Sequence, residues 1–242
     1  MRKRIWELDA IRGILLGLMV YVHVMFDLVE LFGVASPAGL GFYDFCRRWT
    51  GILFITLSGV CATLGAHPVK RGLFVLAGGL CVTAVTAGMY LLGMAGGDIL
   101  IYFGVLHCLG LCMLCWALLR RIPAPVRLVL GVGMIALGIY FLKAVRVDTW
   151  ALIPLGLLPP RFITSDYFPL LPNLGYFLIG SFLGNTVYRK KAGLLPESWG
   201  QNFVSRFFAF CGRHSLTIYL LHQPLIYGVI AAILFILGRV HT

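Results

Sequence analysis

Apolar residues occur in long runs along this chain, and seven of the runs are long enough to suggest membrane spans. They cover residues 11–32, 51–66, 72–95, 99–119, 125–145, 168–188 and 215–237. An α-helix rises about 1.5 Å per residue, so roughly twenty apolar residues cross the hydrocarbon core of a bilayer. The pattern predicts an all-α, polytopic transmembrane helix bundle of about seven spans, with residues 1–242 as a single domain.

The segment 149–165 is only partly apolar and contains Pro154, Pro159 and Pro160. Irregular backbone exposed to lipid would leave peptide groups without hydrogen-bond partners. We therefore expect this segment to be interfacial or re-entrant rather than a further span.

The composition agrees with a membrane protein and excludes an ordinary soluble domain. Hydrophobic residues make up 60% of the chain, charged residues 12%, and the mean hydropathy is +0.93. The start, "MRKRIWELDAIRG", is basic, but Glu7, Asp9 and Arg12 interrupt the apolar stretch that a signal peptide needs. We expect the amino terminus to be retained as part of the first helix.

The net charge of +11 is explained by topology rather than by nucleic-acid binding. If the amino terminus is cytoplasmic, twelve basic residues lie on its side of the membrane: Arg2, Lys3, Arg4, Lys70, Arg71, Arg120, Arg121, Arg127, Arg189, Lys190, Lys191 and Arg206. The other side receives Arg47, Arg48, Lys143, Arg146, Arg161 and Arg239. The asymmetry predicts a cytoplasmic amino terminus, with membrane lipids as partners of the basic residues.

A metal site is not expected from the seven cysteines. Cys108, Cys112 and Cys115 share a helix face, but no matching histidine or acidic cluster accompanies them. They are typical of small buried side chains.

Ionisable residues form one stripe along the first predicted helix. At about 100° per residue, Asp9, Arg12, His23, Asp27 and Glu30 fall within an arc of about 60°. Ionisable groups inside a membrane are costly and commonly functional. The alternative is a buried ion pair that only holds helices together.

His23 and Asp27 are the central pair of this stripe. They are four residues apart, the spacing at which side chains of one helix meet. A carboxylate at that distance can fix the tautomer of an imidazole and stabilise its charged form, as a general base requires.

Further polar residues lie in other predicted spans. Ser215, Tyr219 and His222 share one face of the last span, with Gln223 at its edge. His107 lies in the fourth span, and Ser58 precedes Gly59 in the second. Small residues such as Ser58 and Gly59 also allow close helix packing, which is the alternative explanation for them.

Six segments, in order along the chain, resemble the transmembrane acyltransferases of the heparan-alpha-glucosaminide N-acetyltransferase catalytic-domain family, especially its short bacterial members. They are "ELDAIRG" (7–13), "HVMFDL" (23–28), "FITLSG" (54–59), "YFGVLHCLG" (102–110), "SDYFPLLPNLGYFLIG" (165–180) and "GRHSLTIYLLHQP" (212–224). The spacing of Arg12 and His23 also resembles the motif of related O-acetylating membrane acyltransferases, in which that histidine is catalytic.

The resemblance implies transfer of an acyl group, in the first place acetyl, from cytoplasmic acetyl-CoA to a sugar or glycolipid acceptor at the outer face of a bacterial cytoplasmic membrane. It implies that His23 is the base or a transient acyl carrier and Asp27 its orienting partner. His107 or His222 is then a donor to the oxyanion.

The same resemblance assigns the binding residues. Those for CoA are Asp9, Arg12, Lys70 and Arg71, although Lys70 and Arg71 are explained equally well as topology signals. Those for the acceptor are Ser58, Asp166, Tyr219, His222 and Gln223, although Asp166 is also placed to cap the sixth helix.

Two other function classes compete with an enzyme. A proton-coupled transporter of a small solute also needs ionisable residues in its spans, but no internal repeat is present. A scaffold or partner subunit with a structural polar core is the third hypothesis. Separately, a homodimer is considered as the oligomeric state.

Overall fold

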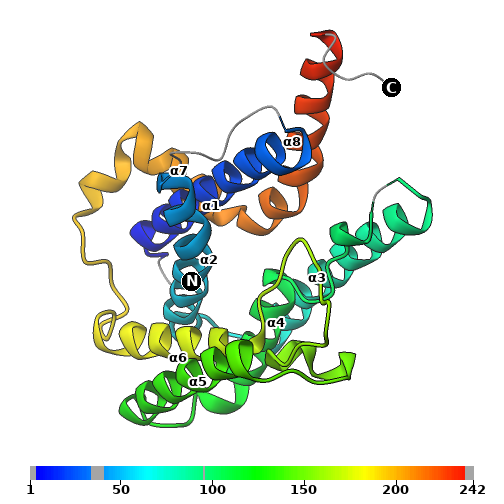
Figure 1. Ribbon diagram of the computed structural model, residues 1–242. Coiled ribbons are helices and arrows are strands. Elements are labelled where there is room, and N and C mark those ends of the chain that lie inside the picture. The colour runs from blue at the N-terminus through cyan, green and yellow to red at the C-terminus, as the bar shows by residue number, and fades with distance from the viewer. Residues whose placement is uncertain (1–3, 34–40, 95, 238–242) are drawn as a thin grey trace. The chain divides into compact units, whose positions relative to one another are not determined.

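The computed structural model describes residues 4–33, 41–94 and 96–237, and helices make up most of this part of the chain (Figure 1). The α-helices are α1 (Trp6–Phe26), α2 (Gly41–Leu64), α3 (Pro68–Leu91), α4 (Val105–Leu119), α5 (Ala124–Ala144), α6 (Leu170–Thr186), α7 (Phe203–Arg213) and α8 (Ser215–Ile236). A π-helix, η1 (Asp27–Leu31), continues α1, and 3-10 helices form η2 (Gly97–Ile99), η3 (Trp150–Leu155) and η4 (Glu197–Gln201). Each of the seven apolar runs overlaps one of these α-helices, which confirms the all-α prediction.

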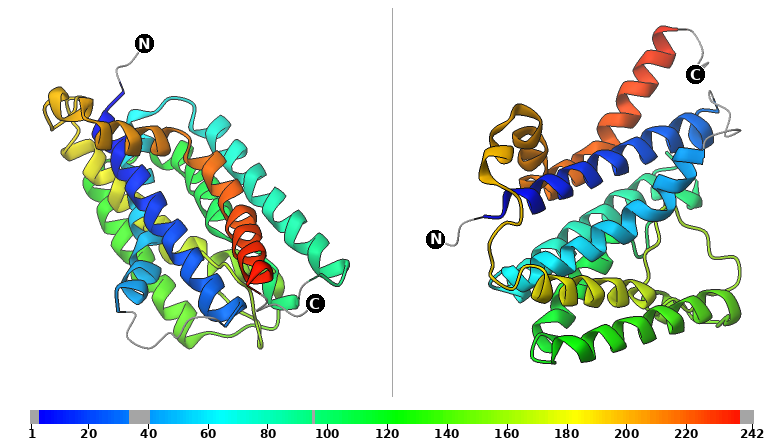
Figure 2. Two further views of the ribbon diagram at one scale, coloured as in Figure 1. Left: turned by 90° about the horizontal axis from the view of Figure 1, so that it is seen from above. Right: turned by 90° about the vertical axis from the view of Figure 1, so that its left-hand side faces the viewer.

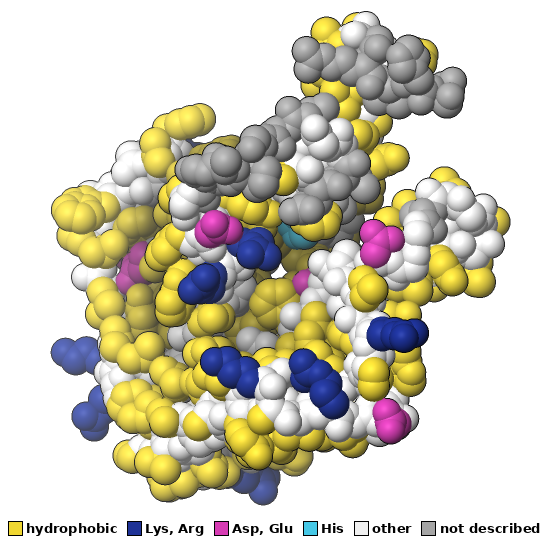
Figure 3. Space-filling view, viewed as in Figure 1, with side chains coloured by type: hydrophobic (Ala, Val, Ile, Leu, Met, Phe, Trp, Pro, Cys, Tyr) yellow, Lys and Arg dark blue, Asp and Glu magenta, His cyan; other side chains and the backbone are white. Residues whose placement is uncertain are grey.

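Four of the described helices are long and apolar enough to cross a membrane: α3, α5, α8, and α1 with its extension to Val29. α4 is a shorter apolar helix. Hydrophobic side chains dominate the visible surface of the helices (Figure 3), as expected where lipid replaces water. The protein is therefore an integral membrane protein. About seven spans were expected, and four helices have the length and composition of a span.

Helix α7 was not predicted. It has 11 residues, too few for a span, and it mixes apolar and polar positions. Its first turn is capped by Asn202, whose side chain accepts a hydrogen bond of 2.8 Å from the backbone N–H of Ser205. A search for continuous apolar runs passes over such a short amphipathic helix.

The chain forms two compact units, which we call unit 1 (Met1–Phe54 and Gly193–Thr242) and unit 2 (Ile55–Ala192). The single domain expected over residues 1–242 stays a prediction. Three predicted basic residues, Arg2, Lys3 and Arg239, and the side chain of Glu30 lie outside the part of the chain that the structure describes.

In unit 1, α1 packs along α7 and also contacts α8 (Figure 2). The crossing of α1 and α7 requires glycine at two positions. A Cβ atom on Gly13 would overlap the carbonyl oxygen of Phe208, and one on Gly212 would overlap that of Asp9. The two backbones therefore touch directly, which fixes the face that α1 turns toward its neighbours.

In unit 2, α3 pairs with α4 and α5 pairs with α6 (Figure 2). The carboxyl-terminal part of α2 crosses α6 by the same device as in unit 1. A Cβ atom on Gly59 would overlap the carbonyl oxygen of Phe177, and one on Gly180 would overlap that of Thr56. This contact supports the packing explanation for Gly59 in the "ITLSG" segment.

The segment between α5 and α6 has the features of an interfacial loop. Trp150 is 54% exposed, and its ring lies 5.2 Å from that of Tyr102 and 6.1 Å from that of Phe162. The hydroxyl group of Tyr167 donates a 2.7 Å hydrogen bond to the carbonyl oxygen of Ile153, and burial raises the pKa of Tyr167. Aromatic side chains of this kind gather at membrane–water boundaries.

Candidate active site

Unit 1 brings together two residues of the first predicted span and two of the last. The ring centroids of His23 (α1) and His222 (α8) lie 4.7 Å apart, with 62° between the ring planes. The amide Nε2 of Gln223 (α8) donates a hydrogen bond of 2.9 Å to Oδ1 of Asp27, at the end of α1. Histidines 23 and 222 are far apart in sequence, so only the packing of α1 with α8 creates this pair.

The backbone is irregular at both sides of this cluster. α1 passes into the π-helix η1 at Asp27, and the N–H of Phe32 donates to the carbonyl oxygen of Asp27 over 2.8 Å. In α8, Pro224 follows Gln223 and lacks the N–H that would bond to the carbonyl of Leu220. Single turns of π-helix frequently occur at functional sites.

Two residues of the cluster are buried, His23 and Gln223 are half-buried, and several of its polar atoms have no hydrogen-bond partner. Asp27 is 0% exposed and His222 is 8% exposed. Within the described residues, Oδ2 of Asp27, Nε2 of His222 and Oε1 of Gln223 are buried and unpaired. The large majority of buried side-chain polar atoms in proteins are paired, so three unpaired atoms on neighbouring side chains call for an explanation.

Asp27 has a different partner from the one expected. No hydrogen bond joins it to His23 among the described residues; its carboxylate accepts from Gln223 instead. The i, i+4 spacing would allow a hydrogen bond between His23 and Asp27. Instead, the carboxylate oxygen Oδ1 accepts a hydrogen bond from Gln223 of α8, 196 residues further on. The expected hydrogen bond from His23 to Asp27 is therefore not part of this structure.

Two other residues of the ionisable stripe, and two further polar residues, also make contacts within unit 1. Arg12 and Asp9 form an ion pair of 3.2 Å between Nη1 and Oδ1. Glu7, which is buried, accepts a hydrogen bond from the backbone N–H of Leu194. The ring of Tyr219 lies 5.3 Å from that of His222.

His107, in unit 2, uses both of its ring nitrogens. Nδ1 accepts a hydrogen bond of 3.3 Å from the N–H of Gly104, and Nε2 lies 3.3 Å from Oγ1 of Thr83. The Thr83 hydroxyl donates its own proton to the carbonyl oxygen of Ile101 over 2.7 Å, so the bond pattern assigns the histidine proton to Nε2. His107 therefore caps the amino terminus of α4.

Asp166 caps the same helix. Its Oδ2 accepts a hydrogen bond of 3.1 Å from the N–H of Val105, the first residue of α4. The expectation that it caps the sixth helix is wrong, since α6 follows Pro169 and has no side-chain cap. The carboxylate stabilises a helix start that lies 61 residues earlier in the chain.

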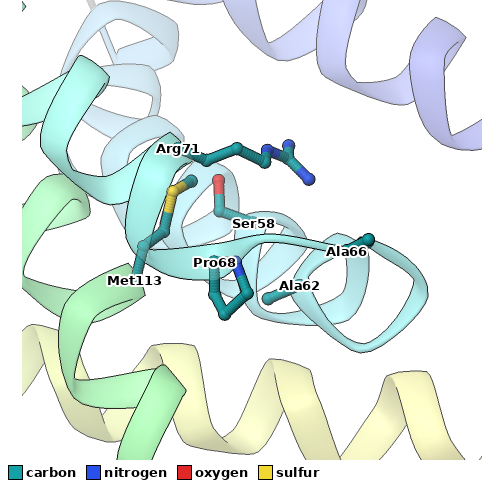
Figure 4. A pocket seen from close by; sticks show the side chains of 7 residues that line it. Ser58, Ala62, Ala66, Pro68, Arg71 and Met113 are labelled. Carbon is teal, nitrogen blue, oxygen red and sulfur yellow. The ribbon is translucent and has the colours of Figure 1, made fainter.

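Two pockets in unit 2 contain the other predicted residues. Ser58 and Arg71 line a pocket of about 10 Å³, with room for roughly one water molecule, and the Arg71 side chain extends past Ser58 (Figure 4). Lys70 and Arg120 line a second pocket of about 510 Å³ at the start of α3. Two cations beside a helix amino terminus suit a phosphate group.

Arg127 was counted only as a charge flanking the fifth span, and its structural environment was missed. It is 2% exposed, donates from Nη1 to Oγ of Ser181 over 2.9 Å, and lies 4.9 Å from the ring centre of Trp116. The available signal was its position inside an apolar run, where an arginine needs partners. Within the described residues there is no group of three or more His, Cys, Asp or Glu side chains that could hold a metal ion.

Comparison with protein families gives one match. The family described as "Heparan-alpha-glucosaminide N-acetyltransferase, catalytic" matches residues 4–224, a range that contains all of the side chains discussed above. No curated protein and no solved structure matches the chain.

Proposed function

Because the chain belongs to the heparan-alpha-glucosaminide N-acetyltransferase catalytic-domain family, we propose that it transfers an acetyl group from cytoplasmic acetyl-CoA to a sugar or glycolipid acceptor at the outer face of a bacterial cytoplasmic membrane. The observation that carries the proposal is the cluster of His23, Asp27, His222 and Gln223, in which Asp27 and His222 are buried and three polar atoms are unpaired.

The reaction requires a base and charge stabilisation. A thioester is already activated, so the enzyme has to deprotonate the acceptor and stabilise a tetrahedral oxyanion. In the proposed reaction His23 takes the proton from the acceptor hydroxyl or amino group as the acceptor attacks the thioester carbon. The C–S bond then breaks, and the CoA thiolate receives that proton. A transient acyl-His23 is the alternative route.

Asp27 supports this chemistry through its charge. It lies one helical turn, about 6 Å along the axis, from His23. Oδ1 of Asp27 accepts the hydrogen bond from Gln223. The unpaired Oδ2 is then available to a positive charge or to an O–H or N–H group of the sugar substrate. Oε1 of Gln223 is a second unpaired oxygen that can accept a hydrogen bond, so Asp27 and Gln223 together suit hydroxyl or amino groups of a sugar. The ring of Tyr219 lies beside His222 and is proposed to contact the same sugar.

The CoA phosphates are assigned to basic residues at the predicted cytoplasmic ends of the helices. In unit 2, Lys70 and Arg71 line the two pockets at the start of α3, and Ser58 shares one of them. In unit 1, Arg12 is already paired with Asp9, so its proposed contact with a phosphate replaces the carboxylate of Asp9 with a phosphate oxygen. Charge-assisted bonds of this type are about twice as strong as neutral ones.

For the remaining residues of unit 2 a structural role competes with the proposed one. His107 is proposed as an oxyanion donor through Nε2–H, and helix capping is the alternative that its two hydrogen bonds support. Asp166 is proposed to meet the acceptor in addition to capping α4.

The test is an acetyl-transfer assay with purified protein in liposomes. Labelled acetyl-CoA is supplied with glucosamine compounds or mixed glycolipids, and His23→Ala is compared with His214→Ala, an exposed histidine of unit 1. We expect labelled product with the wild type and with His214→Ala, and none with His23→Ala. Product formation that survives His23→Ala refutes the catalytic assignment. Proton-coupled solute uptake without CoA release identifies a transporter instead.

A further inference from the structure

The hydrogen bond made by His222 determines which of its ring nitrogens carries the proton. Nδ1 lies 2.6 Å from the carbonyl oxygen of Tyr219. A carbonyl oxygen only accepts hydrogen bonds, so Nδ1 must be the protonated nitrogen. In the neutral ring, Nε2 is then a bare lone pair, and this atom is buried without a partner.

The imidazole of His23 packs against the ring that carries this lone pair. The two rings are in edge contact, with centroids 4.7 Å apart. Asp27 does not compete for His23, since the hydrogen bond to its carboxylate comes from Gln223. No hydrogen bond yet joins the two rings, but catalytic hydrogen bonds often tighten only when substrate binds.

We infer that His222 is the positioning partner of His23, in the role that sequence spacing had given to Asp27. The inference rests on the proposed function, in which His23 is the base. Nε2 of His222 accepts a hydrogen bond from one ring N–H of His23, which leaves the other nitrogen of His23 unprotonated and directed to the acceptor.

The proton balance of this step is simple. The acceptor proton moves to the free nitrogen of His23, and the hydrogen bond to His222 stabilises the resulting imidazolium. The same proton later passes from His23 to the departing CoA thiolate. His222 keeps its Nδ1–H throughout and neither gains nor loses a proton.

Two other roles for His222 give different expectations. A donor to the oxyanion needs an N–H at Nε2, which the tautomer set by Tyr219 does not provide. A purely structural role depends only on the bond from Nδ1 to the carbonyl of Tyr219, and not on Nε2.

Two substitutions distinguish the contribution of the Nε2 lone pair from that of the hydrogen bond between Nδ1 and the Tyr219 carbonyl. In His222→Asn the amide nitrogen takes the place of Nδ1 and keeps a donor for the Tyr219 carbonyl, but nothing replaces Nε2. We expect kcat to fall on the order of 10²-fold, with KM for the acceptor and the unfolding temperature unchanged. His222→Gln places an amide near the position of Nε2, so its oxygen can accept from His23, and we expect part of the activity to return.

A wild-type rate in His222→Asn overturns the inference. So does a loss of activity that is matched by a loss of unfolding temperature in both variants, because that result identifies a structural role. A wild-type protein without acetyl transfer refutes the proposed function and the inference together, whereas an active wild type with an unaffected His222→Asn refutes the inference alone.

The tautomer has a readout of its own. Nitrogen NMR of ¹⁵N-histidine-labelled protein in lipid nanodiscs distinguishes protonated from unprotonated ring nitrogens, and the signals of His222 are those lost in His222→Asn. We expect Nδ1 to be protonated and Nε2 not. The reverse pattern overturns the inference whether or not the protein transfers acetyl groups.

Discussion

Two buried histidines, one in each unit, differ in the hydrogen bonding of their ring nitrogens. His107 and His222 are 5% and 8% exposed, and Nδ1 of each bonds to a backbone group three residues earlier in the chain. At His107 that nitrogen accepts, and Nε2 donates to Thr83. At His222 it donates, and Nε2 has no partner. Burial alone therefore does not separate a helix cap from a chemical group; the pairing of the second nitrogen does.

The same contrast holds for the two units as wholes. Among the described residues six buried side-chain nitrogen and oxygen atoms are unpaired, and five of them are in unit 1: Trp6 Nε1, Glu7 Oε2, Asp27 Oδ2, His222 Nε2 and Gln223 Oε1. The sixth, Nε of Arg127, is in unit 2. Each unpaired atom costs about 1–3 kcal/mol of folding free energy. Most of the unpaired polar atoms therefore lie in the unit that holds His23 and His222.

The strongest test of this contrast is His23→Gln in unit 1. The amide keeps the side-chain volume but cannot act as a base. We expect kcat for acetyl transfer to fall on the order of 10³-fold, with little change in the unfolding temperature. The rate is measured with labelled acetyl-CoA and the unfolding by intrinsic fluorescence in detergent. A large drop in unfolding temperature would give His23 a structural role.

Asp27→Asn is expected to have the next largest effect. The amide oxygen can still accept the hydrogen bond from Gln223, but the negative charge near His23 is lost. We expect kcat to fall roughly 10²-fold, while stability is kept or rises because a buried charge has been removed. Unaltered turnover across several pH values would show that the charge of Asp27 plays no part in the reaction.

His107→Leu examines the other side of the comparison. It removes the acceptor for the N–H of Gly104 and the donor to Thr83. We expect the free energy of unfolding to fall by about 2 kcal/mol. If capping is the whole role of His107, kcat of the folded protein stays unchanged. A loss of kcat without a loss of stability would contradict the capping role and support the oxyanion role.

The smallest expected effect is that of Tyr167→Phe in unit 2, which removes the hydrogen bond to Ile153 and about 1 kcal/mol of stability. Because burial raises the pKa of Tyr167 in the folded state, its contribution is complete below the unfolded value of about 10 and is lost as the pH rises through the folded value. Unfolding temperatures measured between about pH 8 and pH 11 should fall more steeply in the wild type than in the variant. Parallel curves would contradict a buried, protonated Tyr167.

The helices could be predicted because the signal is local. An apolar run of about twenty residues has few alternatives in a bilayer, and α1, α3, α5 and α8 follow from it directly. α7 could not be predicted in this way, because its place is set by contacts of Gly212 and Phe208 with α1 and not by its own hydropathy.

The site could be predicted in part. The angular stripe of α1 correctly indicated that Asp27 is buried, and the six family segments led to the family that the comparison gives. Spacing within one helix, however, suggested the wrong partner for Asp27 and did not distinguish His107 from His222.

The sequence by itself determined that this protein is a helical membrane protein of one acetyltransferase family, with its polar residues concentrated on particular helix faces. Only the tertiary structure decided which polar groups meet: Gln223 with Asp27, His222 with His23, and Asp166 with the start of α4. The reason is physical. Hydropathy and helix periodicity act within a segment, whereas a buried hydrogen bond depends on which segments pack together and on the few tenths of an ångström that separate a partner from a neighbour.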